Sequence, residues 1–456
     1  MKQSLGVIGV WCLQHAFVLT MKNTLRAFFS LYLATLVLLA GSGLFNTYMG
    51  VFLTARNVSE TWVGAMIAAY YLGLVFGARK SHKITIGVGH IRAYAASAAV
   101  ATTTILLQSL VDNLWVWLLL RFGAGLAMVT QFVVLESWLN EQTENESRGV
   151  VFAFYMLISG LGTILGQLSL TLFVELTYKP LVMVAIFFVM SLVPVTLTRR
   201  IHPALQVPAP LAFRYYMRRV PLSLTVLLMA GLITGAFYGL APVYAIKQGL
   251  DSSQVALFLA VSVAAGLVAQ WPLGWLADRI SRVVMIRLNA LLLTLSGGVL
   301  WGWLQLPFVL LLAISSVIGA LQFTLYPLGT AFANDNVDPE RRVGLSAVVY
   351  MLYGLGACLG PLIAGWLMEY FSSEVYFIFV SVCAGVLVLV VRQGKVKGDH
   401  VSEDAPTQYV PNPEGLQTST LVASIDPRVD PEADVSHEIG EEDVADLAAA
   451  SEEVAG

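Results

Sequence analysis

Twelve long apolar runs constrain this chain more than any other feature of its sequence. An α-helix rises 1.5 Å per residue, so about 20 apolar residues cross the ~30 Å hydrocarbon core of a bilayer. Apolar residues make up 57% of the 456 residues and charged residues only 12%. This balance excludes a water-soluble domain and predicts an all-α membrane protein.

The runs form two groups of six, separated by a Pro-rich basic segment that is too polar to span a membrane. We expect a six-helix bundle at 28–198, a cytoplasmic linker at 199–220 and a second six-helix bundle at 221–392. The twelve transmembrane helices are expected at 30–54, 61–78, 92–111, 114–138, 149–173, 180–198, 221–246, 254–277, 284–304, 307–333, 343–368 and 374–392.

An internal repeat relates the two bundles. The segment YMLISGLGTILGQL (Tyr155–Leu168) matches YMLYGLGACLGPL (Tyr350–Leu362), and Gly125 matches Gly319 at nearly the same offset. Duplicated halves of this kind are typical of transporters whose substrate site lies between the halves, near the bilayer midplane. The repeat therefore predicts two pseudo-symmetric bundles around a central cavity.

The two ends of the chain differ from its body. Residues 1–27 form an expected leader in which 5–20 suits neither a span nor a cleavable signal, and Met21 is a possible true start. Residues 393–456 form an expected disordered tail, and 401–456 hold 14 acids and one base. We favour a solvated tail over a docking or regulatory one.

Basic residues predict the orientation. If the N-terminus is cytoplasmic, that side receives 22 Lys and Arg residues, whereas the other side holds only Arg56, Lys179 and Lys247. Cytoplasmic loops carry an excess of such residues. Both termini are thus expected on the cytoplasmic side of the membrane.

Two charges lie inside the expected fourth helix. At about 100° per residue, Met128, Phe132 and Glu136 project within about 60° of Arg121, so the four form one stripe. An intramembrane charge is a functional candidate by default. Glu136 is either a proton-binding or gating group or an interfacial acid that pairs with basic loop residues, and both interpretations stay open.

Polar and aromatic side chains in other expected helices could line the same cavity. Each of them could equally well form hydrogen bonds between helices. Together they describe a cavity with few charges, which suits a neutral, amphipathic or weakly anionic solute. The cavity-lining candidates are Asn46, Tyr48, Gln131, Phe132, Tyr238, Tyr244, Gln322 and Tyr326.

Several chemistries find no support in the sequence. Cys12, Cys358 and Cys383 show neither disulfide nor metal-ligand spacing. A nucleotide-binding loop and a Ser/His/Asp arrangement are also missing. We therefore expect no catalytic residues, no metal, no cofactor and no nucleic-acid partner, and we do not expect an enzyme.

Three motifs resemble signatures of the major facilitator superfamily (MFS). GWLADRISR (Gly274–Arg282) resembles the charged turn after the eighth helix, RFGAG (Arg121–Gly125) the fourth-helix motif, and GACLGPLIAG (Gly356–Gly365) a Gly-Pro motif of antiporters. In the first half, His82–Arg92 has Ile86 in place of the Asp, and Gln167 stands where the Gly-Pro motif would have Pro. The segments FYGLAPVY, AQWPLGWLADR and FTLYPLG look most like the uncharacterised bacterial YcaD-like group, which implies the inner (plasma) membrane of a bacterium.

The resemblance implies a single-chain carrier that alternates access to a central cavity. Asp278, Arg279 and Arg282 are expected to form a cytoplasmic latch: Asp278 caps or pairs with a helix end, and the arginines anchor the turn at the interface. Small residues are expected at helix–helix contacts. These residues are Gly125, Gly162, Gly166, Gly356, Gly360, Pro361 and Gly365.

The leading hypothesis is a monomeric secondary transporter of a small organic solute, proton-coupled in the direction of efflux. The alternative is an uncoupled facilitator, because no acid lies at the membrane midplane. A less favoured alternative is a membrane sensor or scaffold that acts through its acidic tail. The expected partners are the solute, protons and the lipid bilayer.

Overall fold

The computed structural model describes residues 28–143, 148–173, 175–198, 213–304, 306–337, 341–392 and Ser419, without the side chains of Arg79, Glu141 and Val343. The expected leader, most of the expected linker and nearly all of the expected tail lie outside these residues.

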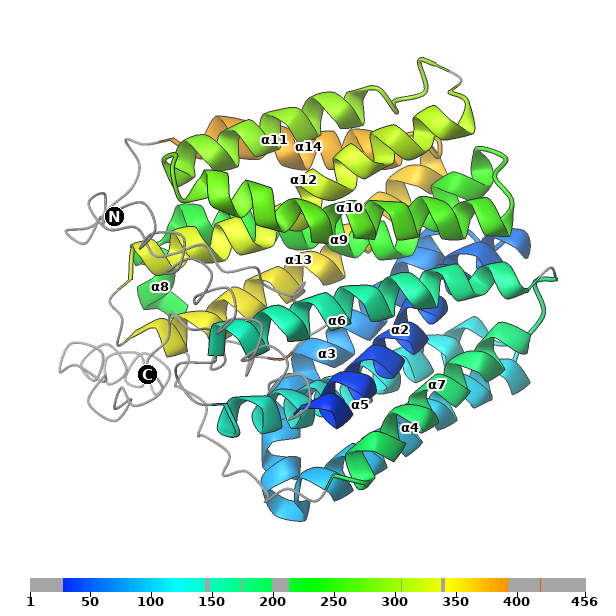
Figure 1. Ribbon diagram of the computed structural model, residues 1–456. Coiled ribbons are helices and arrows are strands. Elements are labelled where there is room, and N and C mark those ends of the chain that lie inside the picture. Colours follow the sequence, from blue (N-terminus) through cyan, green and yellow to red (C-terminus); the bar gives the residue numbers. More distant parts are fainter. Residues whose placement is uncertain are drawn as a thin grey trace, which may run out of the picture.

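The described residues form twelve long helices and two short ones (Figure 1). The two short ones are α8 (Phe213–Arg219), which lies in the expected linker, and η2 (Leu170–Leu172). The long helices are α2 (Phe29–Ala55), α3 (Glu60–Val88), α4 (His90–Leu110), α5 (Leu114–Glu141), α6 (Arg148–Ser169), α7 (Lys179–Thr196), α9 (Pro221–Lys247), α10 (Ser252–Ala277), α11 (Arg282–Gly298), α12 (Phe308–Asp335), α13 (Arg342–Tyr370) and α14 (Val375–Val390).

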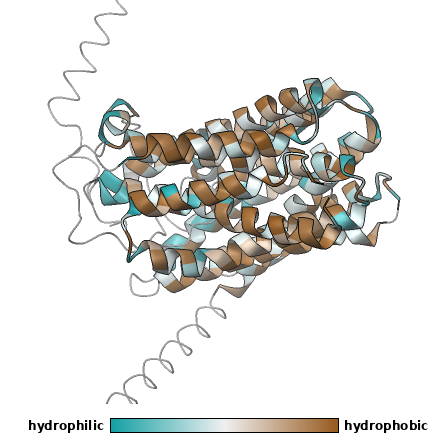
Figure 2. Cartoon of the chain, turned by 90° about the horizontal axis from the view of Figure 1, so that it is seen from above, coloured by the Kyte–Doolittle hydropathy of each residue, from teal (hydrophilic) through white to brown (hydrophobic). Residues whose placement is uncertain are grey.

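Length and hydropathy agree with an all-α membrane protein. Among the described helices, ten are long and apolar enough to cross a membrane, and α14 is a shorter apolar helix. Hydrophilic residues gather near the ends of the helices, whereas the middle sections are mostly apolar (Figure 2). The predicted fold class is therefore confirmed.

Two expected boundaries were wrong. The polar segment after residue 78 was expected to be a loop, yet α3 continues through it to Val88, and α4 begins at His90. Gly89 lies between the two helices with a φ of +84°, which breaks the helical path and which glycine adopts readily. His82 therefore lies in a helix, where burial lowers its pKa. The expected helix 284–304 also ends earlier, at Gly298.

The helices form two halves that lie one above the other in Figure 1. In the first half, α2 packs on α6 and α7, and α5 packs on α3 and α4; in the second, α9 packs on α13, α12 on α10, and α11 on α14. The halves meet mainly through α3 with α13, α6 with α10, and α2 with α9.

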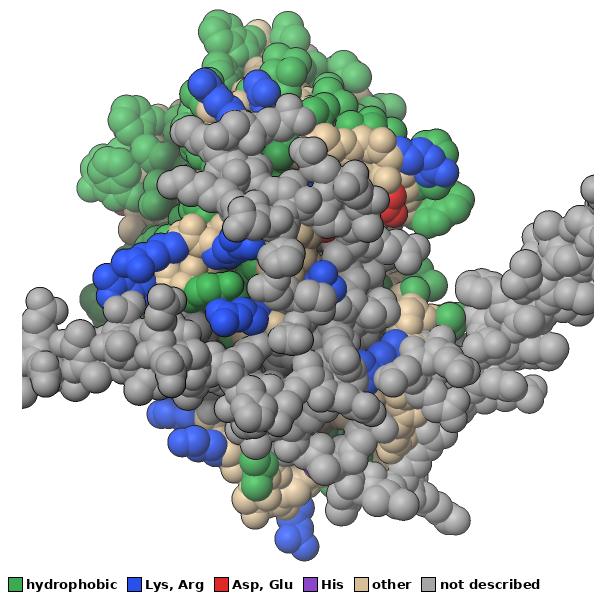
Figure 3. Space-filling view, turned by 90° about the vertical axis from the view of Figure 1, so that its left-hand side faces the viewer, with side chains coloured by type: hydrophobic (Ala, Val, Ile, Leu, Met, Phe, Trp, Pro, Cys, Tyr) green, Lys and Arg blue, Asp and Glu red, His purple; other side chains and the backbone are tan. Residues whose placement is uncertain are grey.

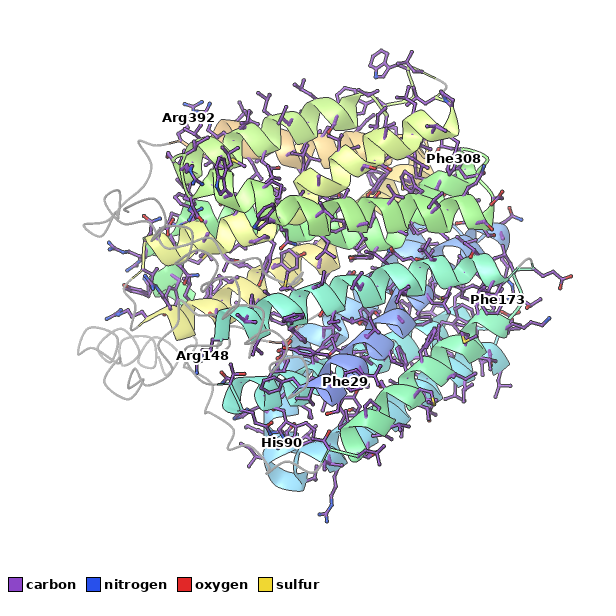
Figure 4. The ribbon with its side chains drawn as sticks, in the orientation of Figure 1. Phe29, His90, Arg148, Phe173, Phe308 and Arg392 are labelled. Carbon is purple, nitrogen blue, oxygen red and sulfur yellow. The ribbon has the colours of Figure 1, made fainter. Side chains whose placement is uncertain are left out.

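The two ends of the bundle are distinguished by their labelled residues in Figure 4. We call the end that holds His90, Arg148 and Arg392 the linker end, because α7 ends there and α9 begins there. The opposite end holds Phe173 and Phe308. Lys and Arg side chains surround the linker-end face (Figure 3).

Close helix contacts explain the internal repeat. A Cβ on Gly166 of α6 would overlap the carbonyl oxygen of Ala40 on α2, and one on Gly360 of α13 would overlap that of Leu232 on α9. Thus each copy of the repeat packs its glycine face on the first helix of its own half. The same holds for Gly162 against Leu36 and Gly356 against Leu228. Gly125 of α5 and Gly319 of α12 instead pack on the second long helix of their halves, against Tyr70 of α3 and Ser262 of α10.

Candidate functional site

Glu136 lies in α5, fully buried, near the linker end. The hydroxyl of Tyr155 on α6 donates a hydrogen bond to Glu136 Oε1 at 2.9 Å. Ser419 donates through its backbone N–H, at 3.0 Å to each carboxylate oxygen, and through its hydroxyl to Oε2. These donors satisfy the carboxylate within a buried environment, where an isolated charge would be costly.

The carboxylate also faces the second half of the molecule. Tyr350 of α13 is buried within electrostatic reach of Glu136, and likewise of Tyr70 on α3 and Tyr326 on α12. Glu136 therefore interacts electrostatically with a residue of the second half as well as with Tyr155 of its own half.

Arg121 is fully buried about 15 residues before Glu136 on the same helix. Its Nε donates to the carbonyl oxygen of Met66 at 3.3 Å, and its Nη2 donates to Asn46 Oδ1 at 3.1 Å. The guanidinium carbon lies 4.3 Å from the ring centroid of Phe45 and 4.9 Å from that of Tyr70. Such cation–π contacts favour a desolvated cation.

One hydrogen-bond donor of the Arg121 guanidinium is not used: Nη1 has no partner among the described residues. The salt bridges of the described part of the chain do not include Arg121 either. Asn46, an expected cavity residue, instead helps to fix the guanidinium between α2 and α3.

Two of the cavity candidates are buried glutamines whose amide groups are not fully used in hydrogen bonds. Gln322 of α12 has no partner for either amide atom among the described residues, and Gln131 of α5 has none for its oxygen. The Tyr238 ring centroid lies 6.2 Å from that of Phe323, the residue after Gln322, and the Tyr326 centroid lies 4.6 Å from that of Tyr353. Unused amide groups beside aromatic rings can bind a neutral polar solute.

Other cavity candidates have contacts within their own half. The Tyr48 hydroxyl donates to the carbonyl oxygen of Thr177 at 2.7 Å. The Tyr244 ring packs edge-on against Phe377 of α14, with centroids 4.8 Å apart. Phe132 is fully buried in the core of its half. These contacts serve helix packing.

The charged turn after α10 forms a compact ion-pair cluster. Arg282, at the start of α11, donates to Asp278 at 2.9 Å and to Asp335, the last residue of α12, at 3.2 Å. Arg282 is buried and joins the turn to the end of α12; its expected anchoring of the turn at the membrane interface stays a prediction. Arg279 donates to the Trp275 carbonyl oxygen and lies over the Trp275 ring.

A further contact joins the halves at the opposite end. Lys247, the last residue of α9, forms a salt bridge with buried Glu60, the first residue of α3. Close backbone contacts flank it, because a Cβ on Gly64 of α3 would overlap the carbonyl oxygen of Pro361 on α13. Gly365 likewise lies against the backbone of Glu60. The halves are therefore tightly closed at this end.

Sequence reasoning missed Glu60, Lys247, Asp335, Tyr155 and Ser419. The first three looked like ordinary loop or helix-end charges, and their partners are far away in sequence, such as the 187 residues that separate Lys247 from Glu60. Among the described residues, no group of three or more His, Cys, Asp or Glu side chains could hold a metal.

Comparison with known proteins places this architecture in a family. The profile of the Major Facilitator Superfamily matches residues 31–342 and 290–425. The chain belongs to this superfamily. It is therefore a secondary transporter and not an enzyme.

Relatives of this MFS chain come from enteric bacteria. An uncharacterised MFS-type transporter of Enterobacter sp. (strain 638) is 28% identical over 371 residues, which cover 80% of this chain and 94% of the relative. The uncharacterised MFS-type transporter YcaD of Escherichia fergusonii is 26% identical over 356 residues, which cover 78% of this chain and 92% of the relative. The expected resemblance to the YcaD-like group is confirmed.

Solved structures share the MFS fold. The nucleoside transporter NupG superposes with a TM-score of 0.67 at 13% identity, covering 79% of this chain and 97% of NupG. A bacterial homologue of the human lysosomal transporter Spinster, in an inward-facing and unoccupied conformation, superposes with a TM-score of 0.63 at 13% identity. The match covers 90% of this chain and 95% of that homologue. At these identities the likeness concerns the fold alone.

Proposed function

We propose that this MFS transporter moves a small organic solute across the bacterial inner membrane by alternating access, coupled to protons through Glu136. The observation that carries the proposal is the burial of Glu136 within a membrane-spanning helix, within electrostatic reach of Tyr350 in the second half. A buried carboxylate changes its charge when it binds a proton, and this changes the energy of the surrounding helix contacts.

The proposed solute is neutral, amphipathic or weakly anionic. Support comes from polar atoms that have no hydrogen-bond partner among the described residues: the Gln131 amide oxygen, both amide atoms of Gln322 and the Arg121 Nη1 donor. A single buried cation can attract a weakly anionic group, but it would not neutralise a polyanion. We propose that the carrier works as a monomer in the direction of efflux.

The proposed orientation places the linker end in the cytoplasm. The Lys and Arg residues around this face support it, as does the excess of 22 basic residues over three in the sequence. In this orientation the structure is closed toward the outside through Glu60 and Lys247.

The first test identifies a solute and then measures coupling. Purified protein is screened by thermal shift against metabolites and drugs, because a ligand of the folded state raises the unfolding temperature. Vesicles containing the protein are then given the solute that binds. We expect movement of that solute to change the internal pH, and a pH gradient to drive its accumulation.

Glu136→Gln should abolish this accumulation while leaving binding measurable. Glu175→Gln, which changes an exposed acid outside the helices, is the matched control and should behave like the wild type. Gradient-driven transport that persists in Glu136→Gln would show that the coupling role is wrong and that the chain is an uncoupled facilitator.

A further inference from the structure

We propose that Ser419 of the C-terminal tail is an internal ligand of Glu136 that holds the transporter in the conformation closed at the opposite end. The docking itself follows from the contacts of two described residues. Its consequence for transport rests on the proposed function, and the two parts are tested separately below.

The contact between Ser419 and Glu136 is a buried set of hydrogen bonds and not a transient contact with the surface of the protein. Both residues are fully buried, although 283 positions separate them in the sequence. The Ser419 N–H donates to both carboxylate oxygens and its hydroxyl to Oε2, while the Tyr155 hydroxyl donates to Oε1. All of these groups donate, and an ionised carboxylate is an acceptor only.

The sequence around Ser419 suits entry next to a buried acid. Residues 401–456 hold 14 Asp and Glu residues, but 415–425 (GLQTSTLVASI) contain none and form the longest uncharged run of this segment. A charged neighbour would have to be desolvated or would repel Glu136. The longest gap between acids in this segment is thus the one that supplies the ligand.

The rest of the tail is complementary to the face that it must approach. Arg and Lys side chains surround the linker end, whereas acids dominate 401–456. Opposite net charges increase the rate of encounter and the local concentration. The 27 residues from Arg392 to Ser419 can span at most about 90 Å when fully extended.

Docking has a mechanical consequence. Tyr350 of α13 lies within electrostatic reach of Glu136 on α5, so Ser419 is bound to a carboxylate that interacts with the second half. Interiors of proteins are close-packed, and a residue fully buried at this place fills volume that the halves need when they close at the linker end. A docked Ser419 therefore favours the closed state of the opposite end.

The first experiment measures docking without any substrate. Hydrogen exchange of the full-length protein in nanodiscs, resolved to single amides, should show the Ser419 amide exchanging at least about tenfold more slowly than in Glu136→Ala. Slow exchange of the helical amides in both proteins verifies that the variant is folded. A Ser419 amide that exchanges at the rate of a free peptide in the wild type would overturn the docking.

The second experiment measures the conformational consequence. Spin labels are placed at the exposed positions Ala55 and Ser253, one in each half at the opposite end, with Cys12, Cys358 and Cys383 replaced by alanine. Ser419→Pro removes the N–H and the hydroxyl, and we expect a second, longer distance to appear. Ser424→Pro, in the same uncharged run, is the control.

Each result of the second experiment decides whether the docked Ser419 holds the opposite end closed. A population with a longer distance between the labels in Ser419→Pro, but not in Ser424→Pro, supports this role. Identical distance distributions in the wild type and Ser419→Pro would overturn it even if the amide is protected. Neither experiment depends on whether Glu136 couples transport to protons, so a failure of the proposed function would be recognised independently.

Discussion

At the scale of single residues, we propose that Arg121 serves solute binding and does not add to stability. Desolvating a guanidinium costs several kcal/mol, and Arg121 has no carboxylate partner among the described residues to offset this. Asn46, Met66 and two aromatic rings hold it in place. Its remaining Nη1 donor is the atom that a solute could use.

Arg121→Met should separate stability from transport. Methionine fills a similar apolar volume and removes the buried charge, so we expect an unfolding temperature equal to or above that of the wild type. Counterflow of the solute found by thermal shift should be lost. Normal counterflow would contradict a role in solute binding, and a sharply lower unfolding temperature would show that Arg121 is structural.

At the scale of elements, the glycine faces of α6 and α13 set how closely the helices approach. Gly166 and Gly360 occupy equivalent places in the two halves, each against the backbone of the first helix of its half. Small residues permit such contacts in membranes, where packing replaces the hydrophobic drive between helices.

Gly166→Ala should therefore destabilise the helix pair. The new methyl group would overlap the Ala40 carbonyl oxygen, and forced overlap in a packed core costs about 1–3 kcal/mol. Gly149→Ala on the same helix is the control, because nothing lies within 4 Å of its added Cβ. Thermal unfolding in detergent should be lowered only in the first variant; equal unfolding temperatures would contradict the close contact.

The turn between α10 and α11 gives a second prediction at this scale. The Asp335 side chain is 9% exposed and that of Asp278 is 33% exposed, so the pair of Arg282 with Asp335 is less screened by water. Removing one partner of a buried pair is more damaging than removing a solvated one.

We expect Asp335→Asn to lower the free energy of unfolding by about 1–3 kcal/mol and Asp278→Asn by less than about 1 kcal/mol. Asp278→Asn should nevertheless impair transport while the protein still inserts into the membrane. Thermal unfolding and vesicle flux measure the two effects. The opposite order of stability, or normal flux in Asp278→Asn, would reject the latch.

At the scale of the whole molecule, the salt bridge of Glu60 with Lys247 connects the two halves where they are closed. Backbone contacts at Gly64 and Gly365 support it. A transporter that alternates access must break this set of contacts and make others at the linker end, so each pair shifts the balance between two states.

Glu60→Gln or Lys247→Gln should each add a longer distance between spin labels at Ala55 and Ser253. The double exchange Glu60→Lys with Lys247→Glu should restore the single short distance, because the pair is reversed but kept. Lys179→Gln, an exposed base outside this contact, is the control. A double exchange that behaves like the single variants would mean that the pair does not hold the halves together.

Much of this architecture could be predicted from the sequence. The apolar runs determined the number and approximate limits of the helices, because the bilayer requires about 20 apolar residues per span. The repeat of Tyr155–Leu168 in Tyr350–Leu362 predicted two related halves, since the same glycine spacing serves the same helix contact twice. Arg121 and Glu136 could be recognised as candidates from the sequence, because a charged residue within a membrane-spanning helix is rare and costly in lipid.

Only the tertiary structure decided which distant groups meet. The partners of Glu60, Arg282 and Glu136 lie 187, 53 and 283 positions away, and no periodicity along one helix encodes such distances. The helical continuation through His82 and the burial of Arg282 likewise depend on neighbouring helices. Apolar periodicity is a local property of the chain, whereas a hydrogen bond or ion pair between helices depends on how the halves are packed together.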